Sequence, residues 1–177
     1  MNISRSILFL ALASITQGVT AGEPEDSIPE PTMFVQQAAQ TGLTEIEAAK
    51  IALARSQDPG IRSFAQRMVK DHGQSNLELA TLATEKGIAA PTRLDAEHQA
   101  MLDDITSKTG RDFDRSYSEH MHMGHTKAVA LFEAAANSAD PAVSGFAKKT
   151  LPTLREHKQL AEKLPGASIK GSPAGGH

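Results

Sequence analysis

The chain has no cysteine, no tryptophan and a single tyrosine among its 177 residues. Without cysteine it forms no disulfide, so a packed hydrophobic core has to hold the fold. The scarcity of large aromatic residues argues against a platform that stacks sugars or nucleic-acid bases. Basic blocks are missing too, and the net charge of −3 makes nucleic acid and anionic membrane surfaces poor partners.

Long apolar runs are also absent, with one short exception at the N-terminus. Arg5 precedes an apolar stretch over residues 7–15 that is too short to span a bilayer, and residues 19–21 form a small-residue cleavage site. This pattern is typical of a signal peptide over residues 1–21, cleaved after Ala21. We therefore expect a periplasmic or secreted protein without a transmembrane segment.

Polar segments rich in proline or glycine flank the central part of the chain. Residues 22–31 (GEPEDSIPEP) and 166–177 (GASIKGSPAGGH) have little to bury, which predicts a disordered leader and a disordered tail. Residues 32–165 are rich in Ala, Leu, Lys, Glu and Gln with a period of 3.6 residues, and contain no convincing strand. They predict one all-α domain.

Capping signals divide this domain into helices. Asp58-Pro59 and Asp140-Pro141 each place a capping aspartate before a proline, and Gly87 is a stop signal. A Phe-Ala pair and then a histidine follow each Asp-Pro, so the second and fourth helices look like equivalent members of two hairpins. The expected helices cover 32–56, 58–87, 112–137 and 140–164, with a short amphipathic helix near 95–107. Two hairpins joined by a long connection predict a ferritin-like antiparallel four-helix bundle.

One ionisable side chain falls on the apolar face of each long helix, near its middle. These residues are Glu45, His72, His125 and His157. A buried carboxylate needs a cation or a proton donor. Three imidazoles and one carboxylate suit Zn, Cu, Fe or Mn without choosing between them. We predict one transition-metal ion inside the bundle; the alternative is a buried Glu–His hydrogen-bond network without metal.

Four neighbouring side chains are secondary candidates. Met68 and Met121 lie one turn before His72 and His125, where thioethers would favour copper, although methionine at such positions is more often core filler. Asp71 and Glu156 each precede an inward histidine. They are expected to be solvated, or to orient a ligand rather than bind metal themselves.

The segment 120–125 (HMHMGH) is dense in imidazole and thioether groups. Helical geometry predicts that His120, His122 and Met123 point to different flanks, which argues against a site built from this segment alone. Glu119 and His122 have the E-x-x-H spacing of di-iron bundles, but they lie off the apolar face. They remain secondary candidates.

Four stretches resemble a ferritin-like family of secreted bacterial proteins whose domain has no known function. They are FVQQAAQTGLTEIEAAKIA, PGIRSFAQRMVKDHGQSNLELATLATEKGI, FDRSYSEHMHMGHTKAVALFEAAANSADP and FAKKTLPTLREHKQLAEKL. The resemblance implies a four-helix bundle with the four inward residues at family positions, and implies no established activity. Gly124 stands where members typically carry an acid. Val69 and Leu154 stand three residues before the histidines of the second and fourth helices, so E-x-x-H motifs are absent there, and di-iron oxidase chemistry and iron storage are poorly supported.

The sequence leaves three classes of function open. The first is a periplasmic metal-binding protein for metal handling or for protection against oxidative or envelope stress. The second is a redox enzyme for peroxide or superoxide at the same site, because three histidines and a carboxylate can leave a coordination position open; no motif for hydrolysis is present. The third is a structural or interaction module of the cell envelope. Protein partners are unknown, and a homodimer stays open.

Overall fold

The computed structural model describes residues 28–167, which contain five α-helices and no strand. The predicted signal peptide and most of the predicted leader and tail lie outside these residues. The helices are α1 Pro31–Arg55, α2 Pro59–Glu85, α3 Ala96–Thr106, α4 Gly110–Ala135 and α5 Pro141–Ala161. The predicted all-α fold, with four long helices and a short one in the connection, is confirmed.

Aspartates begin two of the long helices, as their sequence predicts. Asp58 accepts a hydrogen bond from the Ile61 backbone N–H at 2.9 Å, and proline follows it at the first helical position. Asp140 accepts hydrogen bonds from the next turn of α5 in the same way, with Pro141 following. Gly87 follows α2 with a φ of 65°, a left-handed conformation that glycine adopts without strain.

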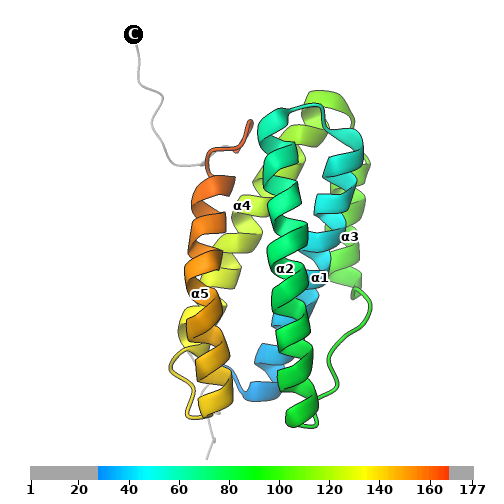
Figure 1. Cartoon of the computed structure of the whole chain (residues 1–177). Coiled ribbons are helices and arrows are strands. Elements are labelled where there is room, and N and C mark those ends of the chain that lie inside the picture. The colour runs from blue at the N-terminus through cyan, green and yellow to red at the C-terminus, as the bar shows by residue number, and fades with distance from the viewer. Residues whose placement is uncertain (1–27, 168–177) are drawn as a thin grey trace, which may run out of the picture.

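The long helices form two hairpins, α1–α2 and α4–α5 (Figure 1). The connection after α2 returns the chain to the end of the bundle where α2 begins, so α2 and α4 run in the same direction (Figure 1). α1 packs against α4 and α2 against α5, while α3 lies against α1 and α4. None of the described helices combines the length and the apolar character needed to cross a bilayer.

Two hydrophobic clusters form the core. One contains a triangle of aromatic rings from three helices, with Phe34 5.1 Å from Phe132 and 6.2 Å from Phe146 between ring centroids. The other contains Phe64, Met68 and residues of α3 and α4. On each long helix a polar residue separates the positions that belong to one cluster from those that belong to the other. The core is therefore divided by a layer of polar side chains.

Candidate metal centre

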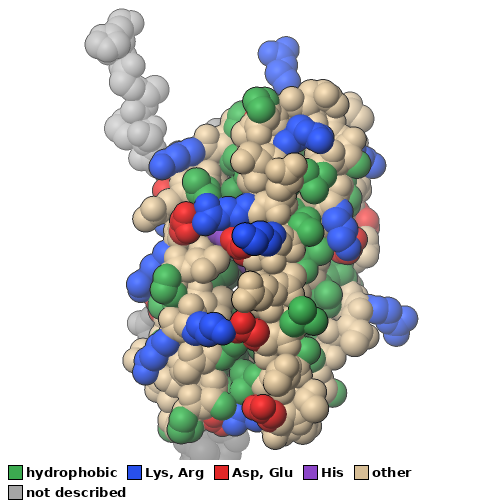
Figure 2. All heavy atoms as spheres, in the orientation of Figure 1, with side chains coloured by type: hydrophobic (Ala, Val, Ile, Leu, Met, Phe, Trp, Pro, Cys, Tyr) green, Lys and Arg blue, Asp and Glu red, His purple; other side chains and the backbone are tan. Residues whose placement is uncertain are grey.

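The polar layer, as we call it, consists of the four predicted residues, one from each long helix. α1 contributes Glu45, α2 His72, α4 His125 and α5 His157, which are 2%, 6%, 0% and 1% exposed. The structure brings all four together. Acidic and basic side chains cover the seam between α2 and α5, and almost no histidine surface is visible there (Figure 2).

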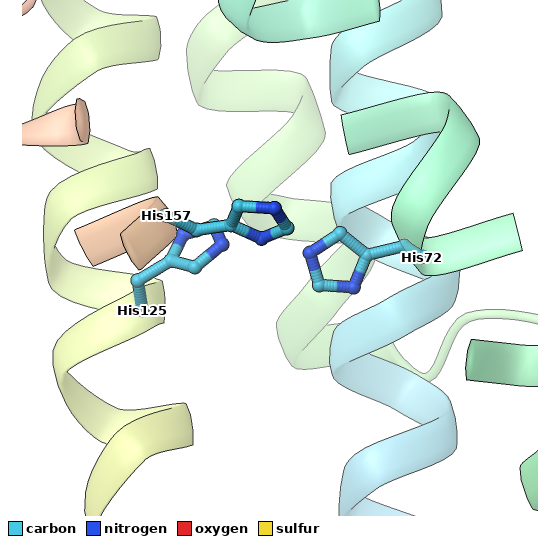
Figure 3. A group of neighbouring side chains, drawn as sticks. All are labelled: His72, His125 and His157. Atoms are coloured by element: carbon cyan, nitrogen blue, oxygen red, sulfur yellow. The ribbon is translucent and has the colours of Figure 1, made fainter. Parts of the chain in front are cut away.

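The three imidazoles point toward one another from α2, α4 and α5 (Figure 3). One nitrogen from each of His72, His125 and His157 can be chosen so that all three lie within 4.8 Å of one another. The ring centroids are 5.3 to 5.6 Å apart. Histidines at this spacing leave room for one ion between their nitrogens.

Backbone and carboxylate groups hold two of these rings. The Nδ1–H of His125 donates to the Met121 carbonyl at 2.8 Å, so its Nε2 carries the lone pair. The Nε2–H of His157 donates to Asp71 Oδ2 at 3.0 Å, so its Nδ1 carries the lone pair. Metal-binding histidines typically donate their other ring N–H in this way, which fixes the tautomer and the ring orientation.

Glu45 lies beside the imidazole group rather than within it. Its Oε2 is 3.0 Å from His72 Nε2 and its Oε1 is 3.3 Å from His125 Nδ1. Neither contact has hydrogen-bond geometry. Both carboxylate oxygens and His72 Nε2 are therefore without a hydrogen-bond partner among the described residues. The carboxylate therefore acts on the imidazoles mainly through its charge.

The charges in the layer shift its pKa values in opposite directions. Burial raises the pKa of Glu45, but the histidines around it, His125 first, outweigh this and hold it at about 2. Burial lowers the pKa of His72, yet the Glu45 carboxylate outweighs burial and raises it above the ordinary value. Burial dominates for the other two histidines: the pKa of His125 is lowered, and that of His157 falls to about 4. The Glu45 carboxylate thus favours the protonated form of His72, whereas burial favours the neutral forms of His125 and His157.

Unpaired atoms make the layer fit for a metal ion. His125 Nε2 and His157 Nδ1 are buried without a hydrogen-bond partner among the described residues, as are both oxygens of Glu45. Buried polar atoms are almost always paired, and leaving one unpaired costs about 1–3 kcal/mol. Two lone pairs aimed into a three-histidine group, next to a carboxylate, are a donor set that a transition metal satisfies.

Residues 17–164 match the family described as Domain of unknown function (DUF4142). The chain belongs to this family. This confirms the resemblance to a family of unknown function that the sequence indicated. No curated protein matches the chain.

Solved structures of a DUF305 fragment and of CopM share the fold. A DUF305 fragment from Deinococcus radiodurans is similar with a TM-score of 0.66 and 20% identity, over 79% of this chain and 94% of that one. CopM in its Cu(II)-bound form has a TM-score of 0.62 and 17% identity, over 75% and 93%. CopM in its Ag-bound form has a TM-score of 0.63 and 17% identity, over 77% and 94%. At these identities the likeness shows a common helical-bundle fold.

The two methionines among the secondary candidates are core residues. Met68 and Met121 are both fully buried within the cluster that contains Phe64. The backbone carbonyl of Met121 accepts the hydrogen bond from His125 Nδ1. Met121 therefore orients this histidine through its backbone rather than through its thioether.

The acidic candidates differ from one another. Asp71 orients His157, as described above, and Arg67 also donates to it at 3.3 Å. The side chain of Glu156 is 52% exposed and pairs with Arg67 at 2.8 Å. Glu119 and His122 are half-buried outside the polar layer, and His122 lies 3.5 Å from Glu162. Of these four residues, Asp71 alone contacts a member of the polar layer through a hydrogen bond that the structure describes.

Sequence reasoning missed two features. The Tyr117 hydroxyl is buried without a partner among the described residues, and burial, together with the Glu45 charge, raises its pKa above the ordinary value. The prediction that His120 and Met123 point to different flanks is wrong: both line a cavity between α1, α3 and α4. A helical wheel places these two residues on one face of α4, about 60° apart, with His122 about 160° from His120 and about 100° from Met123. The spacing alone could have found this.

Proposed function

We propose that the protein binds one transition-metal ion in the polar layer through His72, His125 and His157. Glu45 supplies the compensating negative charge, as a fourth ligand or as the group that pairs with the histidines. The observation that carries this proposal is that each of the three imidazoles has a buried ring nitrogen without a hydrogen-bond partner among the described residues. A transition-metal ion with nitrogen ligands fits such a group.

The alternative, a closed Glu–His network without metal, fits the geometry less well. In such a network each buried nitrogen and oxygen would find a hydrogen-bond partner within the layer. Here the closest contacts between Glu45 and the histidines lack hydrogen-bond geometry, and His157 turns its N–H outward to Asp71. The layer is held by groups around it, while its centre is left with lone pairs.

The ligand types do not distinguish between the transition metals, so the metal to test first is selected from structures with a similar fold. CopM structures with a similar fold are described as Cu(II)-, Cu(I)- and Ag-bound. Copper is therefore the first ion to test. Together with the signal peptide that the sequence predicts, this supports a role in handling or sequestering a metal ion in the periplasm or outside the cell.

The test is the metal content of the mature chain, residues 22–177, produced in a periplasm without a histidine tag. We expect about one equivalent of a single transition metal by elemental mass spectrometry. A His72→Ala/His125→Ala variant should lose it, whereas a His122→Gln variant, altered on another face of α4, should keep it. Wild-type protein that is empty, and that neither binds nor is stabilised by added Cu, Zn, Fe or Mn, would leave a structural bundle with a buried polar network.

A further inference from the structure

A second group of metal-binding side chains surrounds the cavity between α1, α3 and α4. The cavity has a volume of about 380 Å³ and reaches Glu45 of the polar layer. Three of the five methionines in the described residues line it, together with two histidines. These five residues are Met101, Met121, Met123, His98 and His120, and we call this space the methionine cavity.

Both histidines are held by carboxylates. His98 Nδ1 lies 2.7 Å from Asp95 Oδ1, and His120 Nε2 lies 2.9 Å from Asp104 Oδ2. With the N–H donated to the carboxylate, the other ring nitrogen carries the lone pair, an arrangement typical of histidines that bind metal. The described hydrogen bonds of each ring involve only the nitrogen that faces its carboxylate.

The donor types select a class of ion. Thioether sulfur is a soft ligand that prefers Cu(I) and similar ions, whereas hard cations prefer oxygen. The methionine cavity offers sulfur and imidazole nitrogen, in contrast to the polar layer, which offers nitrogen and oxygen. Three acidic residues, Glu45, Glu97 and Asp104, line it against one basic residue, Lys127, which favours a cation.

The inner end of the cavity lies against the polar layer. Gly124 lines the cavity, and a Cβ added to it would lie 3.4 Å from Glu45 Oε1. Glycine therefore leaves open the space in front of the carboxylate that any larger side chain would occupy. Of the four residues of the polar layer, Glu45 alone lines the cavity.

We propose that the methionine cavity binds a soft monovalent cation, Cu(I) or Ag(I), and passes it over Gly124 to the polar layer. Binding in the cavity stands independently of the function proposed above, whereas transfer rests on that function. Met101 and Met123 supply sulfur, and His120 supplies nitrogen. The cavity is the entrance, and the buried layer is the place where the ion is retained.

Silver binding to a variant without the inner site tests the cavity by itself. His72→Gln/His125→Gln protein should bind about one equivalent of Ag(I), supplied as silver nitrate in chloride-free buffer and followed by isothermal titration calorimetry. Adding Met101→Leu and Met123→Leu should weaken this binding at least 10-fold. Adding Met33→Leu should leave it unchanged: Met33 is 48% exposed, close to the 50% of Met123, and does not line this cavity.

Two outcomes would overturn the cavity site. One is that the His72→Gln/His125→Gln protein binds no silver while its helical circular-dichroism spectrum is unchanged. The other is that the protein with Met101→Leu and Met123→Leu binds silver as tightly as the protein with the control substitution Met33→Leu. Leucine conserves the volume of methionine closely, so loss of binding with an unchanged melting temperature reports the sulfur atoms rather than unfolding.

The rate of copper loading tests the transfer step. Gly124→Leu should slow the loading of the polar layer by Cu(I), followed under anaerobic conditions, at least 10-fold. Gly145→Leu is the matched control, because Gly145 is an exposed helical glycine with nothing near its Cβ position. Loading of Gly124→Leu at the wild-type rate would overturn the route. A wild-type polar layer that never takes up metal would instead overturn the proposed function and leave the silver result standing.

Discussion

The second helices of the two hairpins, α2 and α5, begin alike, but the hairpins bring different residues to the polar layer. In each, an aspartate and a proline start the second helix, and a Phe-Ala pair and then a histidine follow. The first helices differ, because α1 brings Glu45 to the layer and α4 brings His125. The histidines differ as well: His72 faces the carboxylate of its own hairpin, while His157 is held by Asp71 from the other hairpin.

Because of this difference, the two hairpins supply different chemical groups to the polar layer. The α1–α2 hairpin supplies both acids that act on the layer, and the α4–α5 hairpin supplies the two imidazoles whose pKa values are lowered. A lowered histidine pKa keeps the ring neutral, which is the form that binds metal. The α1–α2 hairpin therefore provides both carboxylates and one imidazole, and the α4–α5 hairpin provides the other two imidazoles.

The largest expected effect comes from metal binding to this divided site. A free metal concentration 100-fold above Kd should stabilise the wild-type protein by about 2.7 kcal/mol, or about 5–10 °C in melting temperature. His125→Ala removes a lone-pair ligand and should abolish the shift. Glu45→Gln removes charge but no imidazole and should reduce it. Differential scanning calorimetry with and without a chelator measures both; an equal shift in all three proteins would contradict a metal in the polar layer.

The sequence anticipates the layer because its members obey helical periodicity. Glu45, His72 and their two partners each fall on an apolar face at mid-helix, so knowing the four helices suffices to predict that they meet. The contact of Asp71 with His157 is different, because it depends on how α2 packs on α5 and no local pattern encodes that. The methionine cavity likewise requires α3 to lie on α1 and α4, a placement that the long connection leaves undetermined.

The next largest effect is on metal affinity, when the acidic residue that precedes the histidine of α2 or of α5 is replaced. Asp71→Ala frees His157 Nε2 from its hydrogen bond and should weaken metal affinity about 10- to 100-fold, as the loss of an orienting carboxylate generally does. Glu156→Ala removes a side chain that contacts Arg67 at the surface, and affinity should change less than twofold. Competition with a chromophoric chelator gives both values. If the two variants lose the same affinity, the hairpins are not divided as described.

Substitutions of the capping aspartates, Asp58 and Asp140, test the feature that the two hairpins share. Asp58→Ala should destabilise the protein by about 1 kcal/mol, because the Ile61 N–H loses its acceptor. Asp140→Ala should be more damaging, since Asp140 also forms an ion pair with Lys86 between the hairpins. Asp140→Asn separates the two contributions, because asparagine caps a helix about as well as aspartate but carries no charge. Urea unfolding at neutral pH measures the three variants.

The charge of Asp140 gives this comparison a pH dependence. The hydrogen bond from Lys86 is the main reason that the pKa of Asp140 lies below its ordinary value of 3.8. A lowered pKa in the folded state means that the stabilisation is fully present above 3.8 and is lost as the pH falls below it. The difference in unfolding free energy between wild type and Asp140→Asn should thus be constant from about pH 7 to 5 and vanish in stronger acid. A difference that grew on acidification would have the wrong sign for this ion pair.

The smallest expected effect concerns Gly124, which precedes His125 in the α4–α5 hairpin. Gly124→Ala should stabilise α4 by up to about 1 kcal/mol, because alanine is the better helix former. Its methyl group would lie 3.4 Å from Glu45 Oε1, a distance at the edge of ordinary contact, so equilibrium metal affinity should stay the same. Calorimetry and chelator competition on this variant compare the two quantities. A loss of affinity would show that Glu45 needs the open space to move onto the metal, and the carboxylate would then belong with the ligands rather than with the surrounding charge.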